Sequence, residues 1–216
     1  ALSVSVVGEF NKYDGRVHLM ERIEDTGVFE LFIPGLAAGC GYMYEIKRQG
    51  KGTTRKLDPV SRQISSVPIT ASVVSDENMP DSYAWNDGLW MIKRKKEAGK
   101  KKPVTVYEVS LTDWLKEKSA DELVDFVKQE GYTHVCFLPV AEYLNEEMNG
   151  YSTLGYFAVT HRTGGSDAFK KLVDDCHNAG IGVIIDWNGA NFGTEVKGLY
   201  DFDGADAYGY LKPSLE

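Results

Sequence analysis

Three short apolar runs separated by two amphipathic segments organise the second half of the chain. The runs are VTVYEVS (residues 104–110), THVCFLPV (133–140) and GVIID (182–186), and the segments between them cover residues 119–131 and 166–180. The segments have apolar side chains at helical spacing, so the predicted order is strand, helix, strand, helix, strand. Strands linked in this way pair in parallel through right-handed crossovers, and continuous apolar runs indicate strands buried on both faces.

Capping residues support both predicted helices. Ser119 and Glu122 have the spacing of a capping box at the start of the first helix, and Ser166 or Asp167 caps the second. Each segment ends at a glycine, which is typical of a helix stop. The apolar faces consist of Leu123, Phe126 and Val127 in the first helix, and of Phe169, Leu172, Val173 and Cys176 in the second.

Parallel strands of this kind form either a closed barrel or an open sheet. In both folds, ligands bind at the carboxyl ends of the strands. The residues at the carboxyl ends of the three runs are Tyr107–Glu108, Pro139–Glu142 and Asp186–Asn191. We therefore expect these segments to share one rim. A carboxylate at the end of a buried strand can stay hydrated there or meet a ligand, which accounts for Asp186.

The first part of the chain, residues 1–79, has the pattern of an antiparallel β-sandwich. Alternating apolar and polar residues predict strands at 3–10, 27–34, 42–48 and 69–75, and glycine-rich turns separate them. The glycines of residues 35–41 do not fit the spacing of a dinucleotide-binding loop.

A basic linker, residues 80–103, joins the two parts. Its run KRKKEAGKKK is expected to be a solvated connector, because Glu97 and Gly99 interrupt it and no aromatic residue lies within it. A phosphate-binding or membrane-surface patch is the alternative. Trp85, Trp90 and Trp114 are interpreted as anchors where the connector crosses the two regions.

Composition excludes several classes of protein. A formal net charge of -8 argues against nucleic-acid binding, and no stretch is long and apolar enough to span a membrane. The three cysteines form no CxxC pair, and Cys136 and Cys176 lie within apolar segments, which indicates core residues of a cytoplasmic protein. His134, His161 and His177 have no spacing that suggests a metal site. We expect neither a metal nor a cofactor.

Several motifs together resemble a known family. VSVVGEFNKYDGR, GVFELFIPGL and YMYEIKRQG resemble the sandwich module that precedes the catalytic barrel of glycogen and starch branching enzymes. VTVYEVSL, GYTHVCFLPVAEY, the run from NGYSTLGYFA to GVIIDW, and LYDFDGADAY resemble the opening of that barrel. The family belongs to the α-amylase clan. Its members cut an α-1,4 glucan and transfer the segment to a 6-hydroxyl with retention, without a metal or organic cofactor.

The resemblance implies a multidomain fold, β plus α/β. An immunoglobulin-like β-sandwich of the carbohydrate-binding-module type (1–79) and the basic linker (80–103) precede a partial (β/α)8 barrel (104–216) of about three strands. A full barrel requires roughly 250 residues. The chain begins at Ala1 without a methionine, and we expect either a fragment or a decayed relative.

The resemblance also implies the substrate-binding residues. Tyr151 matches a tyrosine that stacks on a sugar ring, and Asp186 matches an aspartate that organises the floor of the active site. Asn191 replaces a histidine that binds sugar, and Tyr13 lies where related sandwiches have a stacking tryptophan. The alternatives stay open: Tyr151 as a rim aromatic, Asp186 as a carboxylate satisfied by backbone amides, and Tyr13 as a locally packed turn residue.

No catalytic residue is expected in the chain. In the family, the nucleophile and the acid/base carboxylate, about 5–5.5 Å apart in retaining enzymes, follow strands four and five. Asp201, Asp203 and Asp206 match an ordinary family loop. The sequence therefore predicts a branching-enzyme-like chain without transferase activity of its own. Two other functions are a module that binds α-glucan without cutting it, and a homo-oligomer in which a second copy covers the incomplete barrel.

Overall fold

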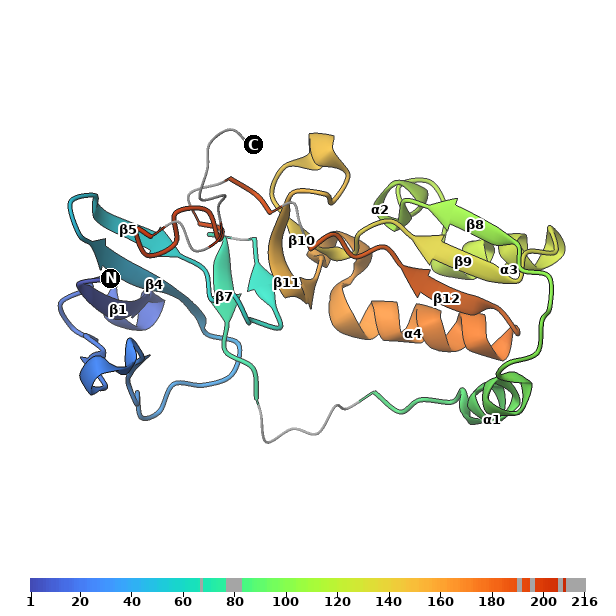
Figure 1. Ribbon diagram of the computed structural model, residues 1–216, viewed down its shortest axis with the longest axis horizontal. Helices are drawn as coiled ribbons and strands as arrows, with labels where there is room; N and C mark the ends of the chain where they lie inside the picture. Colours follow the sequence, from blue (N-terminus) through green and yellow to red (C-terminus); the bar gives the residue numbers. More distant parts are fainter. Residues whose placement is uncertain (67, 77–82, 190–191, 195–196, 206–207, 209–216) are drawn as a thin grey trace.

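The structure is a computed structural model that describes residues 1–66, 68–76, 83–189, 192–194, 197–205 and 208. The antiparallel sheet of the first region lies at one end of the long axis, and a three-stranded α/β unit lies at the other (Figure 1). A β-hairpin lies between them. No helix of the described residues has the length and apolar character required to cross a membrane.

The first region is built on a five-stranded antiparallel sheet, which confirms the predicted sandwich-type fold. Strand β4 is central: β1 pairs along one edge, and β5 and β7 pair with different parts of the other. Strand β6 then pairs with β7. The strands are β1 (Ser3–Gly8), β4 (Gly41–Arg48), β5 (Gly52–Lys56), β6 (Ile64–Ser65) and β7 (Ala71–Val73).

The strand predicted at residues 27–34 is much shorter in the structure. Only β3 (Phe29–Glu30) is extended and paired, with β2 (Glu21–Arg22), in a two-stranded ribbon. The remaining apolar side chains of the segment have little to pack against, and Phe32 is 86% exposed. The alternation of apolar and polar residues predicted a longer strand here. A strand also needs a neighbouring strand to pair with, and in this segment only Phe29 and Glu30 have one.

The connector contains a helix, α1 (Gly88–Glu97), that is docked on α4 (Gly165–Asn178). The Trp90 ring stacks on His177 with the centroids 3.7 Å apart and an angle of 6° between the planes. Asp87 pairs with the same histidine at 2.7 Å. The basic side chains of the helix are exposed as predicted, but the segment is not a free connector.

Three parallel strands form the sheet of the second region, with β9 (His134–Phe137) between β8 (Val106–Val109) and β12 (Gly182–Ile185). The order in space equals the order in the chain, as in a barrel. This arrangement confirms the predicted first strands of a (β/α)8 fold. Register aligns Glu108 with Cys136 and with Ile184, so these three side chains share one face.

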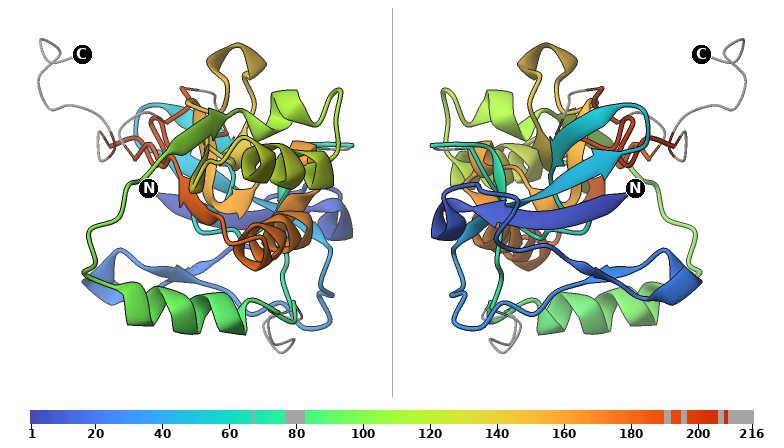
Figure 2. Two further views of the ribbon diagram at one scale, coloured as in Figure 1. Left: turned by 90° about the vertical axis from the view of Figure 1, so that its right-hand side faces the viewer. Right: turned by 90° about the vertical axis from the view of Figure 1, so that its left-hand side faces the viewer.

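The opposite face of this sheet is covered by helices. Helices α3 (Ala120–Gln129) and α4 lie on the same side of the strands (Figure 2). Their apolar side chains form one core with the strands, in which Leu123, Val127, Val135, Phe137 and Leu172 are buried. The face that carries Glu108 has no such layer among the described residues, and Val106 and Ile184 are exposed there.

The helix starts agree only in part with the predicted caps. The Ser119 hydroxyl accepts from the Glu122 amide at 3.2 Å, and the Glu122 carboxylate accepts from the Ser119 amide at 2.7 Å, which is the predicted capping box. The cap of α4 is instead Gly164, with φ of 85°. Ser166 and Asp167 lie inside its first turn. Trp114, which was predicted to anchor the connector, lies in α2 (Leu111–Trp114) and packs near Phe126.

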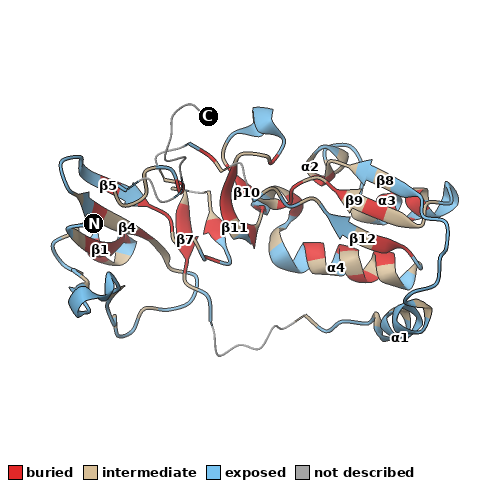
Figure 3. Ribbon diagram, viewed as in Figure 1, coloured by how far each residue is buried: buried red, intermediate tan, exposed pale blue. Residues whose placement is uncertain are grey.

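A hairpin after β9, formed by β10 (Ala141–Tyr143) and β11 (Thr153–Val159), joins the two regions. Leu154 and Ala158 of β11 are buried in one core with residues of the antiparallel sheet. Figure 3 shows the buried colour running from β7 into β11. The partners of these two residues are Val7, Met43, Leu57, Ile64 and Ala71.

Candidate functional site

Tyr151 and Asp186 meet at the carboxyl end of the parallel sheet. The Tyr151 hydroxyl donates to Asp186 Oδ2 at 2.5 Å. Asp186 directly follows β12, and its amide donates to the Phe137 carbonyl at 2.9 Å, which continues the parallel ladder by one residue. Because the backbone at Asp186 is still paired, its carboxylate is held in place at the rim.

Gly150 determines how the loop approaches the sheet before Tyr151. Its φ is 87°, in the left-handed region that favours glycine. A Cβ at this position would lie 2.7 Å from the Pro139 carbonyl oxygen. The close packing on the end of β9 therefore requires glycine, and it directs the following tyrosine toward Asp186.

Negative charge gathers around the tyrosine. The hydrogen bond to Asp186 raises the pKa of Tyr151 to about 12, with smaller contributions from burial and from the charges of Asp186 and Glu108. Burial raises the pKa of the Cys136 thiol, and the charges of the same two carboxylates act in the same direction. Glu108 was not among the predicted site residues, although its place at the end of the first apolar run indicated the rim.

An exposed aromatic ring lies next to this pair. Trp187 is 66% exposed, and its ring is 5.7 Å from the Tyr156 ring. A shallow hollow of about 200 Å³ separates the carboxyl ends of β9 and β12 from β11, and Asp186 and Trp187 form part of its wall. Trp187 was missed in the sequence because its exposure depends on which strands surround β12. Asn191 lies outside the described residues.

Tyr13 lies in the first region, far along the chain from Tyr151, and the structure does not bring the two together. It follows β1 with φ of 57°. Its ring packs against the core shared with β11 and lies 5.7 Å from the Arg55 guanidinium. Arg55 also donates to the Tyr13 carbonyl at 2.9 Å. A role for Tyr13 in sugar binding stays a prediction.

Glu142, which was expected at the rim, lies instead in a buried polar network behind it. One carboxylate oxygen accepts from Arg162 at 2.8 Å and from Thr160 at 3.1 Å, and the other accepts from the His161 amide at 2.9 Å. The Arg162 guanidinium also lies over the Tyr143 ring. The network fixes the hairpin to the start of α4.

Asp201 has a structural role in the described fold. Its carboxylate pairs with Arg48 at 2.6 Å and with Lys51 at 2.9 Å. The hydrogen bond from Lys51 is the main reason why the pKa of Asp201 is lowered. Lys56 donates to the Tyr200 carbonyl at 2.6 Å beside it. These contacts dock the segment after β12 on the antiparallel sheet.

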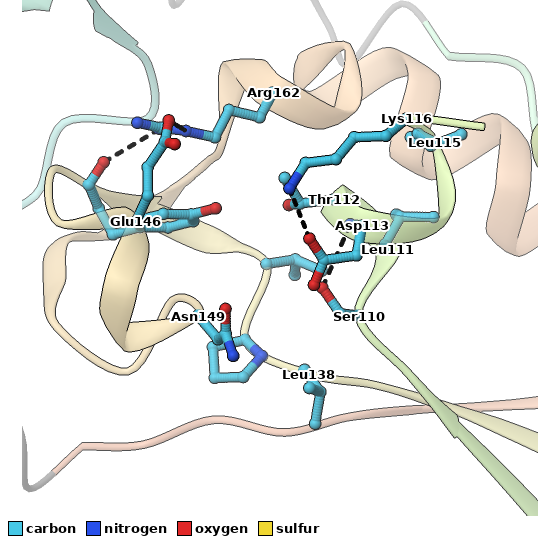
Figure 4. Close-up of a pocket in the computed structure, with 13 residues that line it drawn as sticks. Ser110, Leu111, Thr112, Asp113, Leu115, Lys116, Leu138, Glu146, Asn149 and Arg162 are labelled. Atoms are coloured by element: carbon cyan, nitrogen blue, oxygen red, sulfur yellow. Dashed lines mark hydrogen bonds and ion pairs between the residues drawn. The ribbon is translucent and has the colours of Figure 1, made fainter. Parts of the chain in front are cut away.

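A second depression, which we call the lateral pocket, opens beside the rim (Figure 4). It has a volume of about 300 Å³ and lies between α2, the end of β9 and the loop that precedes Tyr151. Its lining consists of Ser110, Leu111, Thr112, Asp113, Leu115, Lys116, Leu138, Pro139, Val140, Tyr143, Glu146, Asn149 and Arg162. Within the described ranges, no three His, Cys, Asp or Glu side chains are arranged to hold a metal ion.

An antiparallel sheet followed by parallel strands is the fold expected of a sandwich module joined to the first strands of a barrel, and comparisons with known proteins agree with this fold. Residues 1–61 match the family described as carbohydrate-binding module 48, the isoamylase N-terminal domain. A solved structure from Salmonella typhimurium, described as an α-amylase, superimposes with a TM-score of 0.66 at 24% identity, over 91% of this chain and 31% of that one. At this identity the superposition establishes the fold alone.

Curated relatives extend the similarity over nearly the whole chain. The 1,4-alpha-glucan branching enzyme GlgB of Methylococcus capsulatus is 42% identical over 98% of this chain, and that of Nitrosococcus oceani is 41% identical over 98%. The chain spans 30% and 29% of their lengths. The predicted resemblance to the N-terminal part of a glucan branching enzyme is therefore confirmed.

Proposed function

We propose that this chain binds α-glucan at the rim formed by Tyr151 and Asp186 and does not transfer glucan by itself. The observation that carries the proposal is the hydrogen-bonded Tyr151–Asp186 pair in a chain that resembles GlgB over 98% of its length. The match of residues 1–61 to a carbohydrate-binding module supports the same ligand class.

The chemistry of the rim suits a pyranose. An aromatic face packs against the apolar face of a sugar ring, and a tyrosine keeps its hydroxyl in water or in a hydrogen bond. Here the hydroxyl is engaged by Asp186, so the Tyr151 ring is oriented before a ligand arrives. Trp187 offers a second exposed aromatic surface beside it. Preorganised rings lose little conformational entropy on binding.

Glucan transfer requires a nucleophile and an acid/base group on the two sides of the scissile bond. The resemblance assigns both to segments after the fourth and fifth strands, whereas the described parallel sheet has three. The Asp186 carboxylate is also occupied by a tyrosine hydroxyl. We therefore expect no new α-1,6 branches when the purified chain is incubated with amylose. Branching at an ordinary turnover would overturn this part of the proposal.

Affinity electrophoresis in glycogen gels tests the binding. Glycogen should retard the wild-type chain, and Tyr151→Ala should restore most of its mobility because the stacking surface is lost. Tyr200→Ala is the matched control, since Tyr200 is an exposed tyrosine of the segment docked on the antiparallel sheet. Migration of the wild type that does not depend on glycogen would contradict glucan binding.

We also propose the division into a module (1–79), a linker (80–103) and a partial barrel (104–216), and a cytoplasmic location. The last strand of the antiparallel sheet ends at Val73 and the first parallel strand begins at Val106, which supports these boundaries. Reduced thiols fit a reducing compartment, and the described cysteines form no disulfide.

A second candidate function is self-association. Ile184, Ile185, Trp187 and Phe157 are exposed near the uncovered face of the parallel sheet, and exposed apolar surface of this kind marks interaction sites. A second copy of the chain would cover that face. Light scattering should give a dimer that Ile184→Lys dissociates, whereas Leu89→Lys on α1 should not. A monomer at every concentration would rule this out.

A further inference from the structure

The lateral pocket is independent of the Tyr151–Asp186 pair, but it lies at the same end of the sheet. Ser110 follows β8 and Leu138 follows β9, so two strands deliver side chains to it at their carboxyl ends. The loop that ends at Tyr151 contributes Glu146 and Asn149. The loop that ends at Tyr151 therefore separates the rim from the pocket, and a ligand that extends over this loop would reach both.

Two ion pairs stand on opposite walls of the pocket. Lys116 Nζ donates to Asp113 Oδ1 at 2.7 Å on one wall, and Arg162 Nε lies 3.4 Å from Glu146 Oε1 on the other. Figure 4 shows the two pairs facing each other across the hollow. The four charges on the walls cancel, and Arg162 also pairs with the buried Glu142 carboxylate behind the wall, so the pocket has no excess positive charge to attract an anion.

The polar groups can both donate and accept. A lysine ammonium has three N–H donors, and Lys116 gives one to Asp113 while most of its side chain stays exposed. The Asn149 side chain is exposed and makes no hydrogen bond with the described residues, so its amide offers a donor and an acceptor. Sugar hydroxyls also donate and accept, and they need no net charge in the site.

Apolar surface completes the lining. Leu138 and Pro139 lie at the end of β9, next to the polar walls. A hollow of about 300 Å³ is at the lower end of the range for small-ligand sites. Its size and its mixed character suit one or two sugar rings better than a long chain.

We propose that the lateral pocket is a second sugar-binding site, which takes the end of a short α-glucan or a disaccharide through Asp113, Lys116 and Asn149. The inference rests on the proposed function, because it adds a site for the ligand class assigned to the rim. Sugar binding at the rim does not require the lateral pocket, so the two sites can be tested separately.

The test is a titration of the isotope-labelled wild-type chain with maltotriose, followed by two-dimensional NMR. Amide shifts should change in residues 110–116 and 146–149 as well as at Tyr151 and Asp186. The double variant Asp113→Ala/Lys116→Ala keeps the net charge. It should weaken the response of residues 146–149 about tenfold, because it removes hydrogen bonds from charged groups. The response at Asp186 should remain.

The matched control is Asp167→Ala/Lys170→Ala, which removes another i,i+3 ion pair on α4 outside the pocket. It should leave both responses unchanged. Shifts at Tyr151 and Asp186 without shifts around the pocket would overturn the second site and leave the proposed function intact. Absence of any response would overturn both. Inorganic phosphate, titrated in parallel, should not perturb residues 110–116; if it alone does so, the pocket binds anions and the sugar assignment is wrong.

Discussion

The contact between Tyr151 and Asp186 links two residues 35 positions apart in the chain, and it couples ring orientation to protonation. The neutral hydroxyl is the donor, so ionisation of the tyrosine would place two negative charges in contact. This is why the pKa of Tyr151 is raised to about 12. The stability that depends on the neutral phenol should therefore be lost only in alkaline solution.

The pH dependence follows from the direction of that shift. Unfolded tyrosine titrates near pH ~10, and the folded side chain titrates at about 12. The contribution of the contact to the free energy of unfolding is therefore complete below the first value and is lost as pH rises through the second. Urea unfolding at several alkaline pH values should show a shallower loss of stability in Tyr151→Phe than in the wild type. Equal slopes would contradict the contact.

Asp174 carries a different residue-scale prediction. It is 3% exposed and accepts hydrogen bonds from the Asn86 amide at 3.0 Å and from the Tyr83 hydroxyl at 3.1 Å. Asp174→Ala should lower the free energy of unfolding by about 2–3 kcal/mol, because the Asn86 amide and the Tyr83 hydroxyl lose a charged acceptor. Asp175→Ala removes only an i,i+4 pair with Lys171 and should cost about 0.5 kcal/mol or less. Equal losses in chemical denaturation would refute the assignment.

At the scale of elements, the sequence predicted best where local signals agreed with each other. The helix predicted at 119–131 is observed as Ala120–Gln129, with its capping box. The runs at 133–140 and 182–186 contain β9 and β12. Each of these elements has apolar residues at the spacing of its type, a residue that marks its end, and an element close in the chain on which it packs.

Elements that depend on distant partners were predicted poorly. β11 buries Leu154 and Ala158 against the antiparallel sheet, a neighbour that no local pattern identifies. α1 was missed because its exposed basic residues gave no apolar face. At the site, the resemblance indicated Tyr151 and Asp186, but their contact, the exposure of Trp187 and the lateral pocket required the fold.

The packing of β11 on β6 can be tested at one glycine. A Cβ at Gly155 would lie 2.3 Å from Ile64 Cδ1. Gly155→Ala should therefore lower the free energy of unfolding by about 1–3 kcal/mol through overpacking. Ile64→Val removes the clashing methyl group, so the double variant should be more stable than the sum of the single losses predicts. Strict additivity in thermal or urea unfolding would show that the two elements do not touch.

Three long-range attachments tie the whole molecule together. The hairpin shares a core with the antiparallel sheet, Asp201 docks the segment after β12 on Arg48, and Asp174 holds the connector on α4. Each attachment joins residues from both regions or from the connector. None of them can break without exposing buried groups in a neighbour.

The molecule should consequently unfold in one transition. Tryptophan fluorescence reports the second region and the connector, since all four tryptophans lie between residues 85 and 187. Hydrogen exchange of β4 amides reports the antiparallel sheet. Leu154→Ala in β11 should lower protection of the β4 amides and shift the fluorescence transition together, because it opens the shared core. Two separate transitions would show that the regions are independent.

The shared core also bears on how such a module could be moved between proteins. A gene cut after residue 79 would keep Val7, Met43 and Ala71 but would remove the two side chains that cover them. The excised module would then expose an apolar surface to water and tend to aggregate. A successful recombination event would have to transfer the hairpin together with the module. Otherwise the receiving protein would have to supply other apolar side chains that cover the same core.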